Sequence, residues 1–300
     1  MISHSPLRTD KHMKDIYLDS THIHSNTDNS LGMIVKPGID GLEQPEIRLP
    51  SFNRPNVNGA VVPNQLYGGR IISFAGKVFA DEISTYRTLR RTLESAVAIK
   101  RDENNNLLPI TMKFTTMDDL ALQIEVYTRK FNFPDLYLRH GDYKLDLLAP
   151  SVYILGQESK SAIIYPFDGG GMPIAMPIPM AMNANASASS ILVNAGNIDA
   201  NPTIIVNGAI TDPTIVNESN GQTMNFDYTL TSGQYIEINV VDKTVLYYSA
   251  LGATPVNIRD AVTGDFITLA PGNNVIKLTL GGFVTTGTLQ FNWRDSYSGI

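Results

Sequence analysis

The sequence predicts a mainly β protein, with an N-terminal β-barrel or sheet domain carrying one packed helix and a C-terminal antiparallel β-sandwich. Only 17% of the 300 residues are charged, while glycine and proline are frequent, which is typical of short strands joined by many turns. Apolar and polar residues alternate in many segments, as they do when one face of a strand is buried. Because 300 residues exceed the usual size of a single core, two domains are expected.

Strand-like segments and turn signals alternate through the first half. A polar loop is expected from Asp19 to Leu31, which is rich in Ser, Thr, Asn and His. Turns are expected at Pro37-Gly38, Asp40-Gly41 and Pro50-Ser51, since proline fixes φ and glycine accepts positive φ. The expected strands are His12 to Leu18, Met33 to Val35, Val57 to Val62, Arg70 to Val78, Pro109 to Thr115, Leu120 to Thr128 and Tyr143 to Leu148, with short ones near Tyr137 and Ile163.

One convincing helix is expected, from about Asp81 to Ile99, with Asp81 or Ser84 as its N-cap. Its apolar residues recur at three- and four-residue spacing, which places them on one face. They are Ile83, Tyr86, Leu89, Leu93, Ala96 and Val97.

A stretch rich in glycine, methionine and proline, Phe167 to Met182, breaks every period, because these residues continue neither a ladder nor a helix. The domain boundary is placed there, giving domains of residues 1–170 and 171–300. Beyond it, strands recur at roughly ten-residue spacing, the pattern of an antiparallel sandwich, and a jelly-roll or galectin-like fold is expected. The strands are Pro202 to Val206, Thr214 to Val216, Met224 to Leu230, Tyr235 to Val240, Thr244 to Ser249, Asn274 to Leu280 and Thr288 to Trp293.

Composition disfavours several classes of protein. The net charge of −6 argues against a general nucleic-acid binder, whose affinity depends on Lys and Arg. The absence of cysteine excludes disulfides, thiolate zinc sites and a cysteine nucleophile. No signal peptide is expected, because residues 1–14 are polar, and no run approaches the about 20 apolar residues of a membrane helix. Synthesis in a cytosol fits these features.

Candidates for metal chemistry are weak. His22-x-His24, with His12 and Asp19 nearby, could supply ligands to a metal, because alternate strand residues share a face. The segment is loop-like and has no organised third ligand, so a solvated loop is the favoured interpretation.

Candidates for catalysis are weaker still. Asp118-Asp119 and Glu125 could act as paired carboxylates on a glycosidic bond, but Asp-Asp between two strands is more typical of a hairpin turn. Gly169-Gly170-Gly171 lacks the Lys-Ser/Thr of a phosphate-binding loop and is interpreted as a hinge. No Gly-x-Ser-x-Gly elbow is present. The sequence therefore predicts no catalytic, cofactor-binding or metal site, and a protein that is not an enzyme.

Aromatic residues of the second half raise a glycan-binding hypothesis. Tyr247, Tyr248 and Trp293 could stack on sugar rings, but Trp293 ends an alternating apolar strand and is expected in the core. Tyr247 and Tyr248 point to opposite faces of their strand, so at most one is exposed.

The order of several short motifs resembles that of siphophage distal tail proteins. In the first half these are a Gly-Leu-x-x-Pro-x-x-Arg strand at 41–48, a Gly-Ala turn at 59–60 and a Gly-Arg strand with a further glycine at 69–76. No single motif is specific, but their order across nearly the whole chain is. The motifs of the second half are Pro202 to Gly208, Asn217 to Gly221, Asp242 to Val245, Pro271 to Asn274 and Phe291 to Arg294.

The resemblance implies a structural virion protein of a phage tail tip. Six subunits would form a ring between the tail-tube protein and a hub, lysozyme or fibre protein, with DNA as passing cargo and no membrane. The sandwiches would point outward, where some relatives dock receptor-binding proteins and others carry inserted carbohydrate-binding modules. The alternative is a carbohydrate-binding β-sandwich adhesin that attaches to the host surface, and a third interpretation is a ring protein of another injection particle.

Candidate subunit contacts are basic residues and loops of the first half. Arg87, Arg90 and Arg91 form a cluster on the expected helix, interpreted as a solvated face or a subunit contact in preference to a DNA site. The candidate interface residues are Arg70, Arg87 and Arg91, together with the loops Asp19 to Leu31 and Gly41 to Asn64.

Overall fold

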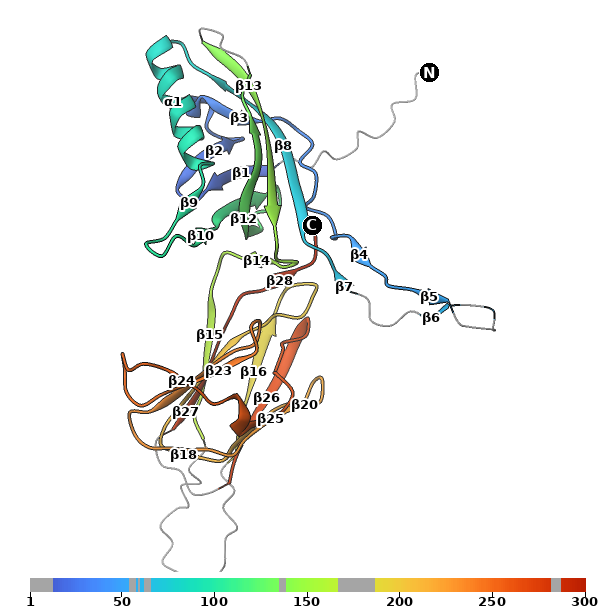
Figure 1. The fold of residues 1–300 in the computed structure, drawn as a ribbon, viewed down its shortest axis with the longest axis vertical. Helices are drawn as coiled ribbons and strands as arrows, with labels where there is room; N and C mark the ends of the chain where they lie inside the picture. The colour runs from blue at the N-terminus through green and yellow to red at the C-terminus, as the bar shows by residue number, and fades with distance from the viewer. Residues whose placement is uncertain are drawn as a thin grey trace, which may run out of the picture. The chain divides into compact units, whose positions relative to one another are not determined.

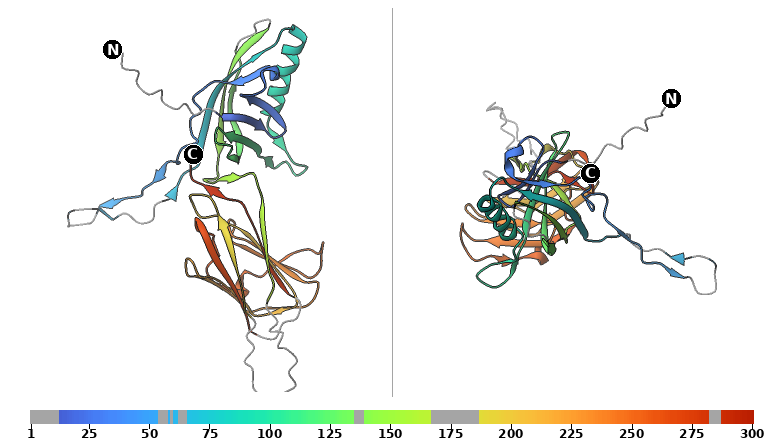
Figure 2. Two further views of the ribbon diagram at one scale, coloured as in Figure 1. Left: turned by 180° about the vertical axis from the view of Figure 1, so that it is seen from behind. Right: turned by 90° about the horizontal axis from the view of Figure 1, so that it is seen from above.

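The computed structural model describes residues 13–53, 58, 60–61, 66–134, 139–166, 187–281 and 287–300 (Figures 1 and 2). The chain divides into two compact units, unit 1 with Met1–Gln157 and Tyr297–Ile300 and unit 2 with Glu158–Ser296. The predicted fold class is confirmed: strands predominate in both units, and the described residues contain one α-helix. That helix is too short to cross a membrane.

Unit 1 is built on a nine-stranded antiparallel sheet of barrel-like form, in the order β2-β1-β11-β12-β13-β8-β3, with β14 paired to β12 and to β28. Along β8 the buried positions alternate with exposed or half-buried ones, as the period of a strand requires. The strands are β1 (Met13–Leu18), β2 (Thr21–Ser25), β3 (Met33–Val35), β8 (Arg70–Phe79), β11 (Ile110–Thr116), β12 (Ala121–Asn132), β13 (His140–Ala149), β14 (Ile154–Gly156) and β28 (Ser296–Tyr297). Short pairs outside this sheet are β4 (Ile47–Arg48) with β7 (Leu66–Tyr67), β5 (Phe52–Asn53) with β6 (Ala60–Val61), and β9 (Lys100–Arg101) with β10 (Leu107–Leu108).

The helix α1 (Ile83–Ala96) packs on this sheet and is shorter than expected. Tyr86, Leu93 and Ala96 are buried, as their spacing predicts. Ile83 was wrongly placed on the buried face, because it is the first helical residue and lies exposed. Neither predicted N-cap is used: Glu82 holds that position, and its side chain makes no capping hydrogen bond.

The polar loop expected from Asp19 to Leu31 was wrong. It contains β2 and a short 3-10 helix, η1 (Asn29–Leu31). β2 pairs with β1 across a bulge between Ile16 and Tyr17. The bulge changes which residues face the core, so that three consecutive ones, 23–25, are buried.

Unit 2 is an antiparallel sandwich whose core lies between a six-stranded sheet, β15-β27-β17-β22-β23-β24, and a five-stranded sheet, β16-β26-β19-β20-β25. Its jelly-roll or galectin-like type stays a prediction. The six-stranded sheet contains β15 (Lys160–Ile164), β17 (Thr203–Asn207), β22 (Tyr235–Asn239), β23 (Thr244–Tyr248), β24 (Val256–Asn257) and β27 (Thr288–Trp293). The five-stranded sheet contains β16 (Ser187–Asn194), β19 (Pro213–Asn217), β20 (Gln222–Phe226), β25 (Val262–Gly264) and β26 (Gly272–Leu280). A separate pair is formed by β18 (Ile210–Thr211) and β21 (Thr229–Leu230), and η2 (Arg259–Ala261) is a 3-10 helix.

The division between the units falls after Gln157, earlier than the boundary expected after residue 170. The reason is β15, which pairs along its whole length with β27 and so belongs to the sandwich. The stretch Phe167 to Met182, with its triple glycine, lies outside the described residues, as does Tyr137.

Candidate functional site

The most unusual feature of unit 1 is the hairpin arm formed by β4, β5, β6 and β7, whose described residues are 47–53, 58, 60–61 and 66–67. These strands project away from the main sheet (Figures 1 and 2). Two short ladders hold its described part together, Ile47 with Tyr67 at the base and Phe52 with Val61 farther out. Every arm residue whose burial is described is exposed, including Phe52 at 64% and Leu66 at 62%. A two-stranded hairpin without a packed face is marginally stable in water, and clustered exposed apolar side chains mark interaction surfaces. The arm is therefore a candidate interaction surface of unit 1.

The base of the arm is fixed to unit 1 by polar contacts. The backbone N–H of Gly68 donates to the Glu46 carbonyl at 2.8 Å, and the Gln44 amide donates to the Tyr67 hydroxyl at 3.0 Å. The chain's C-terminal end lies against the same base, because the Ile300 N–H donates to the Leu42 carbonyl at 3.1 Å. These bonds fix the direction in which the arm leaves the sheet.

Arg70, a predicted interface residue, is buried below this base, at 4% exposure. Its guanidinium donates to three backbone carbonyls: Glu43 at 3.0 Å, Ser298 at 2.8 Å and, more closely still, Val152. Burial lowers the pKa of Arg70 below its ordinary value, although an arginine stays charged in proteins. These three bonds all lie within unit 1, while Nε is buried without a partner among the described residues. Arg70 therefore joins three chain segments, and its burial leaves little of it for a neighbouring subunit.

The three arginines of the predicted basic cluster on α1 do not share one environment. Arg87 and Arg91 are exposed on the outer face of the helix. Arg90 is half-buried: it pairs with Glu94 at 2.9 Å, and its guanidinium lies 4.7 Å from the ring centroid of Phe133. Arg87 and Arg91 thus remain candidates for a subunit contact, whereas Arg90 stabilises the monomer.

Unit 1 also carries an apolar groove beyond the C-terminal end of α1. Its volume is about 110 Å³, and Ile99, which is 72% exposed, stands at its edge. β9 and β10 contribute the exposed Leu107 and Leu108. The remaining lining residues are Ala98, Lys100, Ile110, Tyr127 and Thr128.

The histidines that could have bound a metal are separated. His22 stacks on Tyr17 with ring centroids 4.1 Å apart and contacts Asp15 at 3.2 Å. His24 is buried, and Asp19 accepts from the Thr111 N–H at 2.8 Å. His12 lies outside the described residues. Among the residues the structure describes, no group of three or more His, Cys, Asp or Glu could hold a metal.

Two backbone groups fix the tautomer of His24, and burial favours its neutral form. Nδ1 accepts from the Val35 N–H at 3.2 Å, so the proton is on Nε2, which lies 3.2 Å from the Met13 carbonyl. Burial lowers the pKa of His24, against smaller opposing effects of the Met13 carbonyl and Asp15. A second ring proton would also break the bond from Val35.

A pH-dependent stability of unit 1 follows from His24. Because its folded pKa is below the ordinary 6.5, the stabilisation is complete above about pH 6.5 and is lost as the pH falls toward the folded value, by up to about 1.4 kcal/mol per pH unit. We expect His24→Gln to lose this component, measured as the unit 1 denaturation midpoint by circular dichroism between pH 7 and pH 5. His22→Gln, the control, should keep it. An unchanged pH dependence in His24→Gln would contradict the assignment.

The predicted carboxylate pair lies in the turn between β11 and β12. The Thr116 hydroxyl donates to Asp118, and Asp119 has the positive φ of 65° typical of a tight turn. Glu125 lies opposite Thr111, farther along β12. The three carboxylates are therefore not arranged for acid–base work, and the hairpin interpretation of Asp118-Asp119 agrees with the fold.

Motif residues of unit 2 make structural bonds. Asn274 is buried, and its amide accepts from the Ala270 N–H at 2.9 Å and donates to the Ala270 carbonyl at 2.7 Å. Asn217 donates to Asn274 at 3.1 Å. Trp293 is buried as predicted, and its indole N–H donates to the Val193 carbonyl at 3.1 Å.

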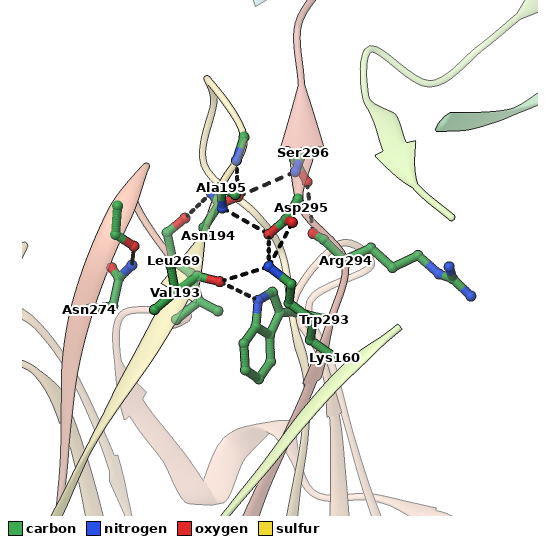
Figure 3. Close-up of polar contacts among 12 residues, drawn as sticks. Lys160, Val193, Asn194, Ala195, Leu269, Asn274, Trp293, Arg294, Asp295 and Ser296 are labelled. Atoms are coloured by element: carbon green, nitrogen blue, oxygen red, sulfur yellow. Dashed lines mark hydrogen bonds and ion pairs between the residues drawn. The ribbon is translucent and has the colours of Figure 1, made fainter. Parts of the chain in front are cut away.

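The closing strand is fixed by a second group of polar contacts (Figure 3). Lys160 pairs with Asp295 at 2.7 Å, and Asp295 also accepts from the Ala195 N–H at 2.9 Å. The buried Asn194 donates to the Leu269 carbonyl at 2.9 Å. These contacts join β15, β16 and the end of β27 in unit 2.

The candidate glycan-stacking tyrosines lie on opposite faces of β23, as their adjacency predicts. Tyr247 packs against the sandwich core and lies 5.3 Å from Tyr228, between ring centroids. Tyr248 lies on the outer face and stacks on Tyr235, with centroids 4.5 Å apart and planes 7° from parallel. Sequence reasoning missed Tyr235, because the pairing of β22 with β23 was not known.

Comparison with known proteins matches part of the second unit to a family model and finds a similar fold for most of the chain. Residues 195–297 match the family model of the siphovirus-type tail component, C-terminal domain. The crystal structure of SPP1 Dit (gp 19.1), described as a paradigm of hub adsorption apparatus in phages infecting Gram-positive bacteria, has a similar fold. The TM-score is 0.56 at 15% identity, over 94% of this chain and 98% of that chain.

Two structures of the activated phage P2 baseplate are more distant. The structure with Ca has a TM-score of 0.42 at 10% identity, over 86% of this chain and 89% of that chain, and the structure with Sr has 0.44 at 11%, over 93% and 96%. A search of curated proteins finds no match. The resemblance to siphophage distal tail proteins predicted from the motifs is confirmed by the tail-component domain and the shared fold.

Proposed function

We propose that this chain is a structural subunit of a siphophage tail hub, in which six copies join head to tail in a ring between the tail tube and the tail-tip proteins. DNA passes through the ring as cargo. The tail-component domain and the fold shared with SPP1 Dit support a structural tail protein. The observation that carries the ring is the hairpin arm, whose exposed apolar residues require a partner.

A second copy of the chain is the partner that best fits the arm. The arm and the apolar groove lined by Ile99, Leu107 and Leu108 are different surfaces of one unit, and both expose large aliphatic side chains. A contact between unlike surfaces is heterologous, and repeated heterologous contacts close into a ring when their rotation allows. Arg87 and Arg91 are the polar candidates for the same interface.

The native mass tests this function. Six copies of the 32.9 kDa chain have a mass of about 197 kDa, measurable by light scattering, and ring-shaped particles should appear in negative stain. If the purified protein stays monomeric, the measurement is repeated with added tail-tube protein, because assembly on a template lowers the cost of closing a ring. Monomers under both conditions would reject the ring.

The role of the arm is tested by Leu66→Asp. A charge at a side chain that becomes buried between copies costs several kcal/mol, so we expect the assembled fraction to fall at least about tenfold at a given protein concentration. The control is Ile191→Asp in unit 2, because Ile191 and Leu66 are each 62% exposed.

Both variants should unfold as the wild-type chain does, since both side chains are exposed in the monomer. Equal assembly of Leu66→Asp and the wild-type chain would remove the arm from the interface. Equal loss in both variants would show a general effect of added negative charge, and would also remove the arm.

A further inference from the structure

The outer face of the six-stranded sheet in unit 2 has an unusual composition. Its outward positions form three rows across the strands, which we call the amide face. Row one contains Ser161, Asn292, Thr203, Asn239 and Thr244. Row two contains Ile163, Gln290, Ile205, Glu237, Leu246 and Asn257. Row three contains Thr288, Asn207, Tyr235 and Tyr248.

The amide face is almost uncharged, because Glu237 is its single charged residue at neutral pH. Five of its residues are asparagine or glutamine, and four are serine or threonine. Each amide carries both donors and an acceptor, and each hydroxyl can donate or accept. Such a surface matches a ligand that is itself neutral and covered with hydroxyl groups.

Part of this hydrogen-bonding capacity remains unused. The Gln290 amide donates to Asn292 Oδ1 at 2.9 Å and to Ser161 at 3.3 Å, and the Asn207 amide donates to Thr288 at 3.1 Å. These bonds hold the side chains in fixed orientations. Oε1 of Gln290, Nδ2 of Asn292 and Oδ1 of Asn207 have no partner among the described residues, so acceptors and a donor are preset on one surface.

An aromatic wall stands at one side of the amide face. Tyr235 is flanked in its row by Asn207 and Tyr248, and Tyr248 covers one face of its ring by parallel stacking. Asn207 lies on the other side of Tyr235 in this row. Ile205 and Leu246, beside Glu237 in row two, add half-buried aliphatic surface. Aromatic and aliphatic surface beside polar groups suits the mixed C–H and hydroxyl faces of a sugar ring.

The opposite sheet of the sandwich has fewer amides on its outer side. Ile191 and Val193 are exposed there and Val275 is half-buried, while the Thr214 hydroxyl donates to Asn225 at 3.0 Å. Lys277 on the same sheet pairs with Glu218 at 3.7 Å. The amide-rich composition therefore belongs to one face and is not a general property of the unit 2 surface.

We propose that the amide face binds a neutral oligosaccharide chain, with one sugar unit against the aromatic wall of Tyr235 and Tyr248 and the hydroxyls of successive units bonded to Asn207, Gln290 and Asn292. Six strands at the usual spacing are about 24 Å wide, so several sugar units can lie across the sheet. The lone carboxylate of Glu237 opposes polyanions, while a single charge is too little to recruit a polycation. This binding site does not depend on the ring.

The test is affinity electrophoresis of the full chain in native gels that contain dextran, mannan, galactomannan or soluble starch, with dextran sulfate as the anionic control. We expect at least one neutral polysaccharide to retard the protein, and a free oligosaccharide of the same sugar to reverse the effect. Tyr235→Ala and Gln290→Ala should each raise the dissociation constant about tenfold, as expected for central contacts of a small site. Thr214→Ala, half-buried on the outer side of the other sheet, should bind as the wild-type chain does.

The outcomes separate this proposal from the ring. Trp293, the single tryptophan, reports whether unit 2 of each variant is folded, and light scattering reports whether assembly is unchanged. No retardation by any of the four neutral polysaccharides would overturn the proposal and leave the face to a protein partner. Retardation that both substitutions leave unchanged, or that dextran sulfate matches, would overturn it as well.

Discussion

Gly76→Ala is expected to destabilise unit 1 by about 3 kcal/mol, the upper end of what overpacking a core costs. Gly76 lies in β8 directly opposite Tyr143 of β13. A Cβ atom at Gly76 would lie 2.2 Å from Cζ and 2.3 Å from the hydroxyl oxygen of Tyr143. Tyr143 is 1% exposed, so its ring has no free space into which it can move. The glycine provides the space that the tyrosine ring fills.

The single tryptophan makes the measurement selective. Trp293 lies in unit 2, so the tryptophan fluorescence transition should stay at the wild-type denaturant concentration while the circular dichroism transition of unit 1 moves down. The control is Gly68→Ala, whose Cβ would meet no atom closer than 3.4 Å. An unchanged unit 1 transition in Gly76→Ala would contradict the packing argument.

Tyr143 supplies two further controls. Its hydroxyl is buried without a hydrogen-bond partner among the described residues, and burial raises its pKa. Tyr143→Phe should therefore be neutral or stabilise unit 1 by about 1 kcal/mol. In a Tyr143→Leu background both clashing atoms are absent, so Gly76→Ala should cost much less than in the wild-type chain, and this difference measures the coupling of the two residues.

Sequence reasoning was strongest where one face of an element is buried. The alternation of residues 235–240 and 288–293 predicted strands that the structure contains, because a buried face imposes its period on the sequence. It also placed Trp293 in the core. The motif glycines Gly41 and Gly76 were recognised by order alone, and the structure supplies the reasons: a Cβ at Gly41 would lie 2.0 Å from the Ile71 carbonyl, and Gly76 contacts Tyr143.

Elements without such a face were missed. β2 reads as a polar loop, because it carries Thr21, His22 and Ser25 and its bulged pairing hides the alternation. The arm was expected as one strand from Val57 to Val62, but the described part holds only the two-residue β6 there. An exposed hairpin has no buried face, so its sequence carries no period that could be recognised.

Which residues share a surface such as the amide face depends on the order of the strands in the sheet. That order cannot be predicted from local sequence patterns. Ser161, Thr203 and Asn292 share a row of the amide face only because β27 lies between β15 and β17. Alternation predicts that each residue points outward, but it does not predict the row. Tyr235 was overlooked for the same reason, although Tyr248 was identified.

Arg70 was misjudged because an arginine in a sequence suggests an exposed charge, whereas here three carbonyls from distant segments converge on it. We expect Arg70→Lys to destabilise unit 1 by about 3 kcal/mol, because one ammonium cannot span three acceptors in fork geometry and buried carbonyls lose their donors. Arg87→Lys, at an exposed site of α1, should change stability by less than about 0.5 kcal/mol. Circular dichroism and Trp293 fluorescence again separate the two units.

The contrast between the buried Arg70 and the exposed Arg87 also decides which charge-reversal variants can test the ring interface. Arg70→Glu would place a carboxylate beside three carbonyl oxygens, so we expect it to unfold unit 1, and a lost ring in that variant would say nothing of the interface. Arg87→Glu keeps the fold and tests the outer face of α1 directly. If Arg70→Lys unfolds at the wild-type denaturant concentration, the three carbonyl bonds are not needed for stability, and Arg70 becomes a candidate for the interface again.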